Sequence, residues 1–248
     1  VAASSLEVST QLWAVIARYR FAAVADRVRI TLVTADGKSD MNSLSIRTVP
    51  GDSGLARLEF GDITLVARRG VLRAVHARDR ATFVEISVND KDASPATVLR
   101  TLLPALALPQ ISLAFDEGDV SWCPLVTDLA WESAQRITVD GAGGVRLSGR
   151  SSVGRALLEI AEGRVRRFEA DLTPDGQTRL IVECTPITPG DPATWPLDLT
   201  GRRKLTSLVL LRPLGPGLHT GDRWPATLAL TDIVTGKPLS LRTPGMRS

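Results

Sequence analysis

A Leu-rich segment at residues 99–115 (LRTLLPALALPQISLAF) constrains most strongly how this 248-residue chain can fold. It carries one charge, Arg100, and is otherwise almost wholly apolar. A membrane-spanning helix needs about 20 continuous apolar residues, and Pro104 and Pro109 interrupt this segment, so we do not expect it to cross a bilayer. The segment therefore has to cover another apolar surface. On one face of a sheet, it is either a packed part of the core or the lid of an apolar cavity.

The patterns on both sides of this segment predict a sheet preceded by a helix. Ser4 and Glu7 have the spacing of a capping box, which predicts an amphipathic helix over residues 5–21. From Val24 the hydrophobic period changes to two, and about eleven short alternating runs follow, joined by short turns and interrupted by a helical insert at 94–128. We predict an α+β fold, with a strongly curved antiparallel sheet of about eleven strands and the helices on one face.

Composition limits the class of partner and the domain organisation. The 44% of hydrophobic residues can form a sizeable core, and the net charge is only +3. Arginines alternate with acids along the predicted strands and aromatic residues make up 4%, so we expect no nucleic-acid partner. After Thr188 the sequence becomes rich in Pro and Gly. We predict one domain over residues 1–187 and a C-terminal extension over 188–248.

The sequence offers few groups for catalysis. His76 lies in an alternating run and His219 in the C-terminal extension, and neither belongs to a metal-binding motif. The sequence contains no nucleophile motif, phosphate-binding loop or CxxC pair, so we expect no enzyme activity, no cofactor and no metal. Cys123 and Cys184 leave two alternatives open, either one disulfide in an oxidising compartment or two buried free thiols.

Three stretches carry a family resemblance: residues 9–33 (STQLWAVIARYRFAAVADRVRITLV), the Leu-rich segment, and residues 154–172 (GRALLEIAEGRVRRFEADL). Together with the order of elements, they make residues 5–187 resemble the LolA/LolB-like superfamily of periplasmic lipoprotein carriers. The resemblance implies an open half-barrel whose helices cover the concave face and enclose an apolar cavity for acyl chains. The chain departs from the family in its aliphatic, Arg-rich strands, so no lid-closing arginine is carried over.

A second resemblance lies in the C-terminal extension. Residues 220–241 (TGDRWPATLALTDIVTGKPLSL) resemble the start of a redoxin, or thioredoxin-like, domain, but no CxxC follows in this chain. The small residues after Val1 and the resemblance to periplasmic carriers together predict an exported protein of the periplasm or cell envelope, with its leader removed.

We therefore expect non-enzymatic binding and carriage of a lipid or lipoprotein acyl chain, with membrane-bound donor and acceptor proteins as further partners. The alternatives are an envelope sensor or protein-interaction module with the same fold, or an accessory domain beside a redoxin. The predicted cavity residues come from the alternating runs and from the Leu-rich segment: Leu44, Ile46, Leu58, Phe60, Ile63, Leu65, Leu99, Leu102, Leu103, Leu106, Ile111 and Phe115.

Overall fold

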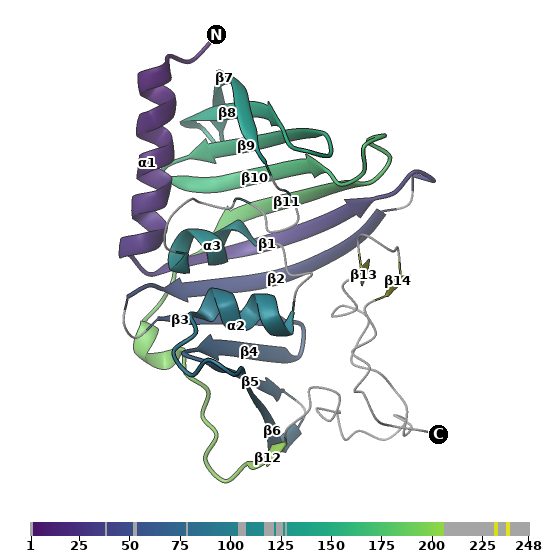
Figure 1. Cartoon of the computed structure of the whole chain (residues 1–248). Helices are drawn as coiled ribbons and strands as arrows, with labels where there is room; N and C mark the ends of the chain where they lie inside the picture. Colours follow the sequence, from purple (N-terminus) through teal and green to yellow (C-terminus); the bar gives the residue numbers. More distant parts are fainter. Residues whose placement is uncertain are drawn as a thin grey trace. The chain divides into compact units, whose positions relative to one another are not determined.

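The computed structural model shows an α+β architecture with a 12-stranded, mostly antiparallel sheet and, in the part of the chain that it describes, three α-helices (Figure 1). The described residues are 2–37, 39–51, 54–77, 79–103, 108–116, 122, 126, 128–205, 231–232 and 237–238. The predicted class and the antiparallel pairing are confirmed.

The predicted strong curvature is wrong. The sheet is neither strongly curled nor closed, and it ends in two edge strands, β7 (Ala130–Val139) and β12 (Arg203–Leu205). Hydrophobic alternation specifies which side chains share a face. It does not specify the strand stagger, bulges and bends that curl a sheet toward a barrel. Hydrophobic alternation therefore predicts the strands but not an open half-barrel.

The chain divides into two compact units, Val1–Asp52 with Ala107–Gly190, and Ser53–Leu106 with Asp191–Ser248. In the first unit seven strands follow one another in the order β2-β1-β11-β10-β9-β8-β7, all antiparallel. Besides β7, they are β1 (Val24–Val33), β2 (Ser39–Val49), β8 (Ala142–Arg150), β9 (Arg155–Ala161), β10 (Arg164–Asp171) and β11 (Arg179–Pro186). The predicted boundary between residues 187 and 188 stays a prediction.

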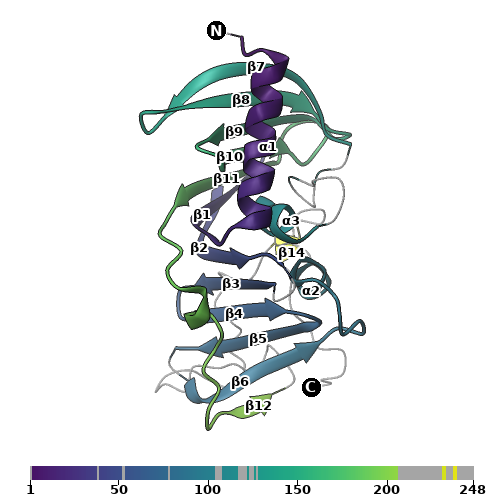
Figure 2. The ribbon, with the colours of Figure 1, turned by 90° about the vertical axis from the view of Figure 1, so that its left-hand side faces the viewer.

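The first helix, α1 (Ser5–Phe21), has the bounds that the sequence predicts. The Oγ of Ser4 accepts a hydrogen bond from the backbone N–H of Glu7 at 3.2 Å, which satisfies one of the free donors at the helix start. The helix crosses β8, β9 and β10 and buries Val15 and Tyr19 (Figure 2). Three large apolar side chains of the helix are exposed, with exposed fractions of 78% for Leu6, 69% for Trp13 and 83% for Phe21.

The two faces of this strand set differ in chemistry. The face toward α1 is apolar, with Phe168, Leu158 and Val182 fully buried. On the other face, one row of directly opposed residues runs across five neighbouring strands from β1 to β8 and alternates in charge, in the order Arg29, Glu183, Arg167, Glu159 and Arg146. Three of its four pairs lie within 4 Å, at 3.7, 3.1 and 2.7 Å. Opposite charges in register favour this pairing.

The second unit is a smaller strand set with one helix. Its strands β3 (Leu55–Phe60), β4 (Ile63–Arg68), β5 (Val71–His76) and β6 (Asp79–Ser87) pair in sequence order and antiparallel, and β12 adds to β6 in parallel. The helix α2 (Pro95–Leu102) packs against β4 and β5. A guanidinium N–H of Arg57 donates to the carbonyl oxygen of Trp195 at 2.8 Å, beside a short 3-10 turn, η1 (Pro192–Thr194).

The predicted helical insert contains two short helices, α2 and α3 (Pro109–Phe115), and part of the segment lies outside the described residues. Across the described residues, no helix is long and apolar enough to cross a membrane. Most of the redoxin-like stretch also lies outside the described residues. The two pieces that are described are a pair of two-residue strands, β13 (Thr231–Asp232) and β14 (Lys237–Pro238).

Gly70, in the turn between β4 and β5, sets the position of the segment that leads into α2. Its N–H donates to the carbonyl oxygen of Ala93 at 2.9 Å, and a Cβ added to it would lie 2.7 Å from the Cα of Lys91. We expect Gly70→Ala to lower the free energy of unfolding by more than the ~1–2 kcal/mol that left-handed backbone alone costs, because the backbone of Lys91 must also move. Urea denaturation would measure the loss.

Gly61 is the matched control. It also has a positive φ, but nothing lies within 4 Å of its added Cβ. We expect Gly61→Ala to lower the free energy of unfolding only by the cost of the left-handed backbone. Equal losses of stability in the two variants would show that the backbone of Lys91 does not oppose a Cβ at position 70.

Candidate functional site

In the second unit the predicted cavity residues from the strands form one apolar layer. Leu58 lies opposite Leu65, and Phe60 lies opposite Ile63, in the register of β3 and β4. All four side chains are buried. Since α2 packs on β4, the structure brings together the two groups that the sequence placed together, the sheet residues and the start of the Leu-rich segment.

The helix α2 buries apolar side chains. Its buried residues are Pro95, Ala96, Val98 and Leu99, and Leu103 just beyond its end is also buried. Its N-cap is local, because the Oγ of Ser94 accepts from the N–H of Thr97 at 3.2 Å within the same turn. Leu102 is half-buried at the margin of the helix. An eight-residue helix is marginal in water by itself, so these contacts stabilise it.

The other predicted residues lie in the first unit or outside the described residues. Leu44 and Ile46 are buried on β2, and α3, which carries buried Ile111, packs on that strand. Phe115 at the end of α3 is half-buried, and Leu106 lies outside the described residues. That these residues line one cavity with the second unit's layer stays a prediction.

Sequence reasoning missed a buried polar cluster in the first unit, which centres on Asp26. One carboxylate oxygen accepts from the hydroxyl of Tyr19 on α1 at 2.8 Å and, at 3.4 Å, from the side-chain amide of Gln110 on α3. The other accepts from the guanidinium of Arg164 on β10 at 2.9 Å. Asp26 is fully buried. The only sequence signal was an acidic residue where an apolar one would continue the alternation of the first strand.

Burial changes the ionisation of this cluster. Loss of hydration raises the pKa of Asp26 above its ordinary value, although Tyr19 and Arg164 act in the opposite direction. Burial, together with the nearby Asp26 charge, also raises the pKa of Tyr19, so the phenol stays protonated and can donate. An ionised Asp26 therefore depends on Arg164, the cation beside it.

The structure describes one of the two cysteines, Cys184. Cys184 is a free, buried thiol whose sulfur accepts from the side-chain amide of Gln110 at 3.0 Å. Burial raises its pKa, so the thiol is unreactive in the folded protein. Cys123 lies outside the described residues. No group of three or more His, Cys, Asp or Glu side chains that could hold a metal ion occurs among the residues that the structure describes.

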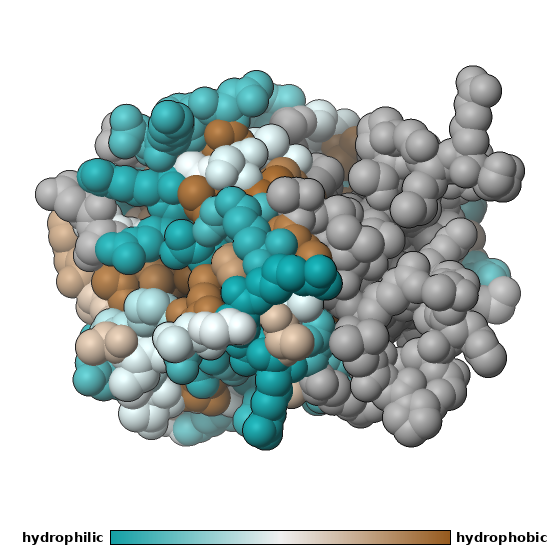
Figure 3. Space-filling view, turned by 90° about the horizontal axis from the view of Figure 1, so that it is seen from below, coloured by the Kyte–Doolittle hydropathy of each residue, from teal (hydrophilic) through white to brown (hydrophobic). Residues whose placement is uncertain are grey.

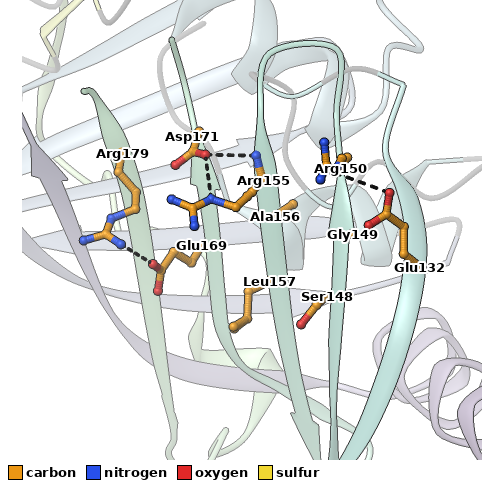
Figure 4. A pocket seen from close by; sticks show the side chains of 10 residues that line it. All are labelled: Glu132, Ser148, Gly149, Arg150, Arg155, Ala156, Leu157, Glu169, Asp171 and Arg179. Carbon is orange, nitrogen blue, oxygen red and sulfur yellow. Dashed lines mark hydrogen bonds and ion pairs between the residues drawn. The ribbon is translucent and has the colours of Figure 1, made fainter. Parts of the chain in front are cut away.

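A pocket of about 290 Å³ lies at one end of strands β7 to β11 in the first unit (Figure 4). It combines three arginines and three acids with a small apolar floor. Its lining residues are Glu132, Ser148, Gly149, Arg150, Arg155, Ala156, Leu157, Glu169, Asp171 and Arg179. The sequence analysis identified none of them as site residues, because they alternate with core residues along five different strands and meet only when the strands pair.

Comparison with known proteins gives a distant structural likeness and no sequence match. No family model and no curated protein matches the sequence. Among solved structures, the chain is similar to a DUF1329 family protein from Desulfovibrio piger, with 8% identity, coverage of 72% of this chain and 91% of that one, and a TM-score of 0.29.

The chain is also similar to two further solved structures. A LolA superfamily protein from Nitrosomonas europaea has 11% identity, coverage of 75% and 92%, and a TM-score of 0.28. A putative outer membrane lipoprotein-sorting protein domain from Vibrio parahaemolyticus has 6% identity, coverage of 77% and 95%, and a TM-score of 0.28. The structural similarity to these LolA superfamily and lipoprotein-sorting structures is distant. The comparisons do not support the redoxin resemblance.

The buried pair of Asp26 and Arg164 gives a stability prediction. We expect Asp26→Asn to lower the free energy of unfolding by about 3–5 kcal/mol, because Arg164 stays charged without its buried partner. Arg29→Gln, which removes an exposed partner of Glu183 at 3.7 Å, should cost less than ~1 kcal/mol. Urea denaturation of both variants would measure the difference, and equal losses would refute a special role for the cluster.

The same pair predicts a pH dependence. An acid whose folded pKa is raised holds its proton more tightly in the native state, so stability falls as the pH rises through that folded pKa. In Arg164→Met the cation is absent and the pKa of Asp26 should rise further. We therefore expect the stability deficit of Arg164→Met, relative to the parent protein, to shrink on acidification from pH 7 toward pH 4. A deficit that is constant or grows over this range would show that Asp26 does not titrate there.

Proposed function

We propose that this protein binds the acyl chain of a lipid or lipoprotein, with the apolar layer of β3 and β4 and the covering helix α2 as the binding region. The observation that carries the proposal is that the side chains which this short helix buries are all apolar. An acyl chain can make the same apolar contacts with the sheet that the buried side chains of α2 make, so it can take their place there.

The energetics support a binding mode without covalent chemistry. Each methylene moved from water into an apolar site contributes about 0.8 kcal/mol, so one long chain gives useful affinity. Only the helix has to move, and its hydrogen-bonded N-cap lies within the helix itself. In this proposal the predicted residues Leu58, Phe60, Ile63 and Leu65 contact the chain from the sheet, while Leu99, Leu102 and Leu103 contact it from the cover.

In this proposal the protein acts as a carrier and not as an enzyme, and it acts in the periplasm or cell envelope. Its ligand would be received from one membrane-bound partner and released to another. The remaining predicted residues Leu44, Ile46, Ile111 and Phe115, and Leu106 outside the described part, belong to this proposal as further lining positions.

A protein-interaction module is the second candidate function, and one observation favours it. Leu6, Trp13 and Phe21 recur at intervals of seven and eight residues on α1, so they lie along one exposed side of the helix. Large apolar side chains grouped on a surface are typical of interaction sites. On the face shown in Figure 3, the apolar residues lie among hydrophilic ones.

Acyl binding can be measured with a series of fatty acids. We expect displacement of a fluorescent fatty acid by C8, C10 and C12 acids to improve about fourfold for each added methylene, as burial of the chain requires. Affinity that does not change with chain length would contradict burial of the chain, and no saturable uptake by the parent protein would leave α2 as a packed part of the core.

Leu102→Asp tests the place of binding. A carboxylate at this half-buried margin can stay hydrated while it disfavours an apolar chain beside it, so we expect at least a tenfold loss of affinity with a melting temperature close to that of the parent. Thr101→Asp adds the same charge one residue earlier on the same helix, at an exposed position, and should bind as the parent does. Equal binding by Leu102→Asp and the parent would exclude α2 as the cover.

A further inference from the structure

Two arginines that oppose each other directly form the rim of the pocket in the first unit. Arg150 ends β8, Arg155 begins β9, and the two face each other in the register of these strands. Like charges in this position are destabilising unless something screens them. The two side chains contact carboxylates on opposite sides, Arg150 with Glu132 on β7 and Arg155 with Asp171 on β10 (Figure 4).

These contacts leave N–H groups of both arginines without an acceptor. Each is a single 3.5 Å contact through Nε, and the side chains are 73% and 82% exposed. Within the described part of the chain, the terminal nitrogens of both guanidinium groups have no hydrogen-bond acceptor. Each guanidinium can therefore offer two parallel N–H groups to a new ligand.

Two carboxylates of the pocket, in contrast, already have donors. Glu169 accepts from Arg179 at 2.9 Å through one oxygen and from Arg167 at 2.8 Å through the other. Asp171 accepts from the backbone N–H of Arg155 at 2.9 Å, and its side chain is buried. The carboxylates of Glu169 and Asp171 thus already have donors, whereas Arg150 and Arg155 keep unused N–H groups, so a ligand held by these two arginines has to accept hydrogen bonds.

We propose that this pocket binds a phosphoryl group, held between Arg150 and Arg155 over the floor formed by Leu157 and Ser148. A carboxylate has two oxygens, which one guanidinium satisfies, whereas a phosphoryl group has enough oxygens for two guanidinium groups and the Ser148 hydroxyl. The bound anion would also relieve the repulsion between the opposed arginines. A volume of about 290 Å³ lies at the small end of ligand sites, which suits a head group and not a whole lipid.

The phosphoryl group has two sources, a soluble phosphate ester or a lipid head group, and the experiment separates them. Calorimetric titrations at fixed ionic strength would use inorganic phosphate, glycerol 3-phosphate and acetate. Flotation would use phosphatidylcholine vesicles with and without phosphatidic acid. Binding of glycerol 3-phosphate alone assigns a soluble ester, and retention by the phosphatidic acid vesicles assigns a head group.

We expect Arg150→Gln and Arg155→Gln each to weaken phosphate binding at least tenfold, while Arg29→Gln on the same sheet face leaves it unchanged. Phosphate should raise the melting temperature of the parent and leave that of each pocket variant unchanged. The proposal is overturned if acetate binds as well as phosphate, if the pocket variants bind as the parent does, or if the parent binds none of the probes.

Discussion

The carboxylate of Asp26 is the point at which two helices and two strands of the first unit meet. It lies on β1 and contacts Tyr19 of α1, Gln110 of α3 and Arg164 of β10. Burying this charge is costly, and the attraction of Arg164 together with the surrounding hydrogen bonds offsets the cost only in the observed geometry. The helix α3 has seven residues and no side-chain cap at its N-terminus, so it relies on this contact from Gln110 together with its buried apolar side chains, such as Ile111 and Leu113.

The two short helices of the Leu-rich segment are therefore held in different ways. In the first unit α3 has polar contacts at both ends, from Gln110 to Asp26 and from the guanidinium of Arg20 to the carbonyl oxygen of Asp116 at 2.8 Å. In the second unit α2 buries apolar side chains on apolar strands. Polar contacts have strict distances and few substitutes, whereas apolar contacts can be exchanged for those of another apolar molecule. This difference is the reason for placing the proposed acyl site at α2.

On the face of the first unit's strands that points away from α1, charged side chains form two different arrangements. Along the central row, opposite charges alternate from strand to strand, and the close pairs stabilise the register. At the end of β8 and β9 this alternation fails, because Arg150 opposes Arg155. The pocket lies at this irregularity, and the proposed phosphoryl ligand would supply the negative charge that the row lacks there.

Local pattern was enough to predict much of this protein from its sequence. The capping residues Ser4 and Glu7 fixed α1 to the residue, and the alternation predicted the antiparallel strands, because both features depend only on neighbours along the chain. The burial of Leu58, Phe60, Ile63 and Leu65 followed from the same alternation. The absence of strong curl in the sheet, the cluster around Asp26 and the pocket at Arg150 could not be predicted in this way. They depend on strand order and register, which place residues from distant parts of the chain within a few ångströms of one another, and only the tertiary structure determines that order.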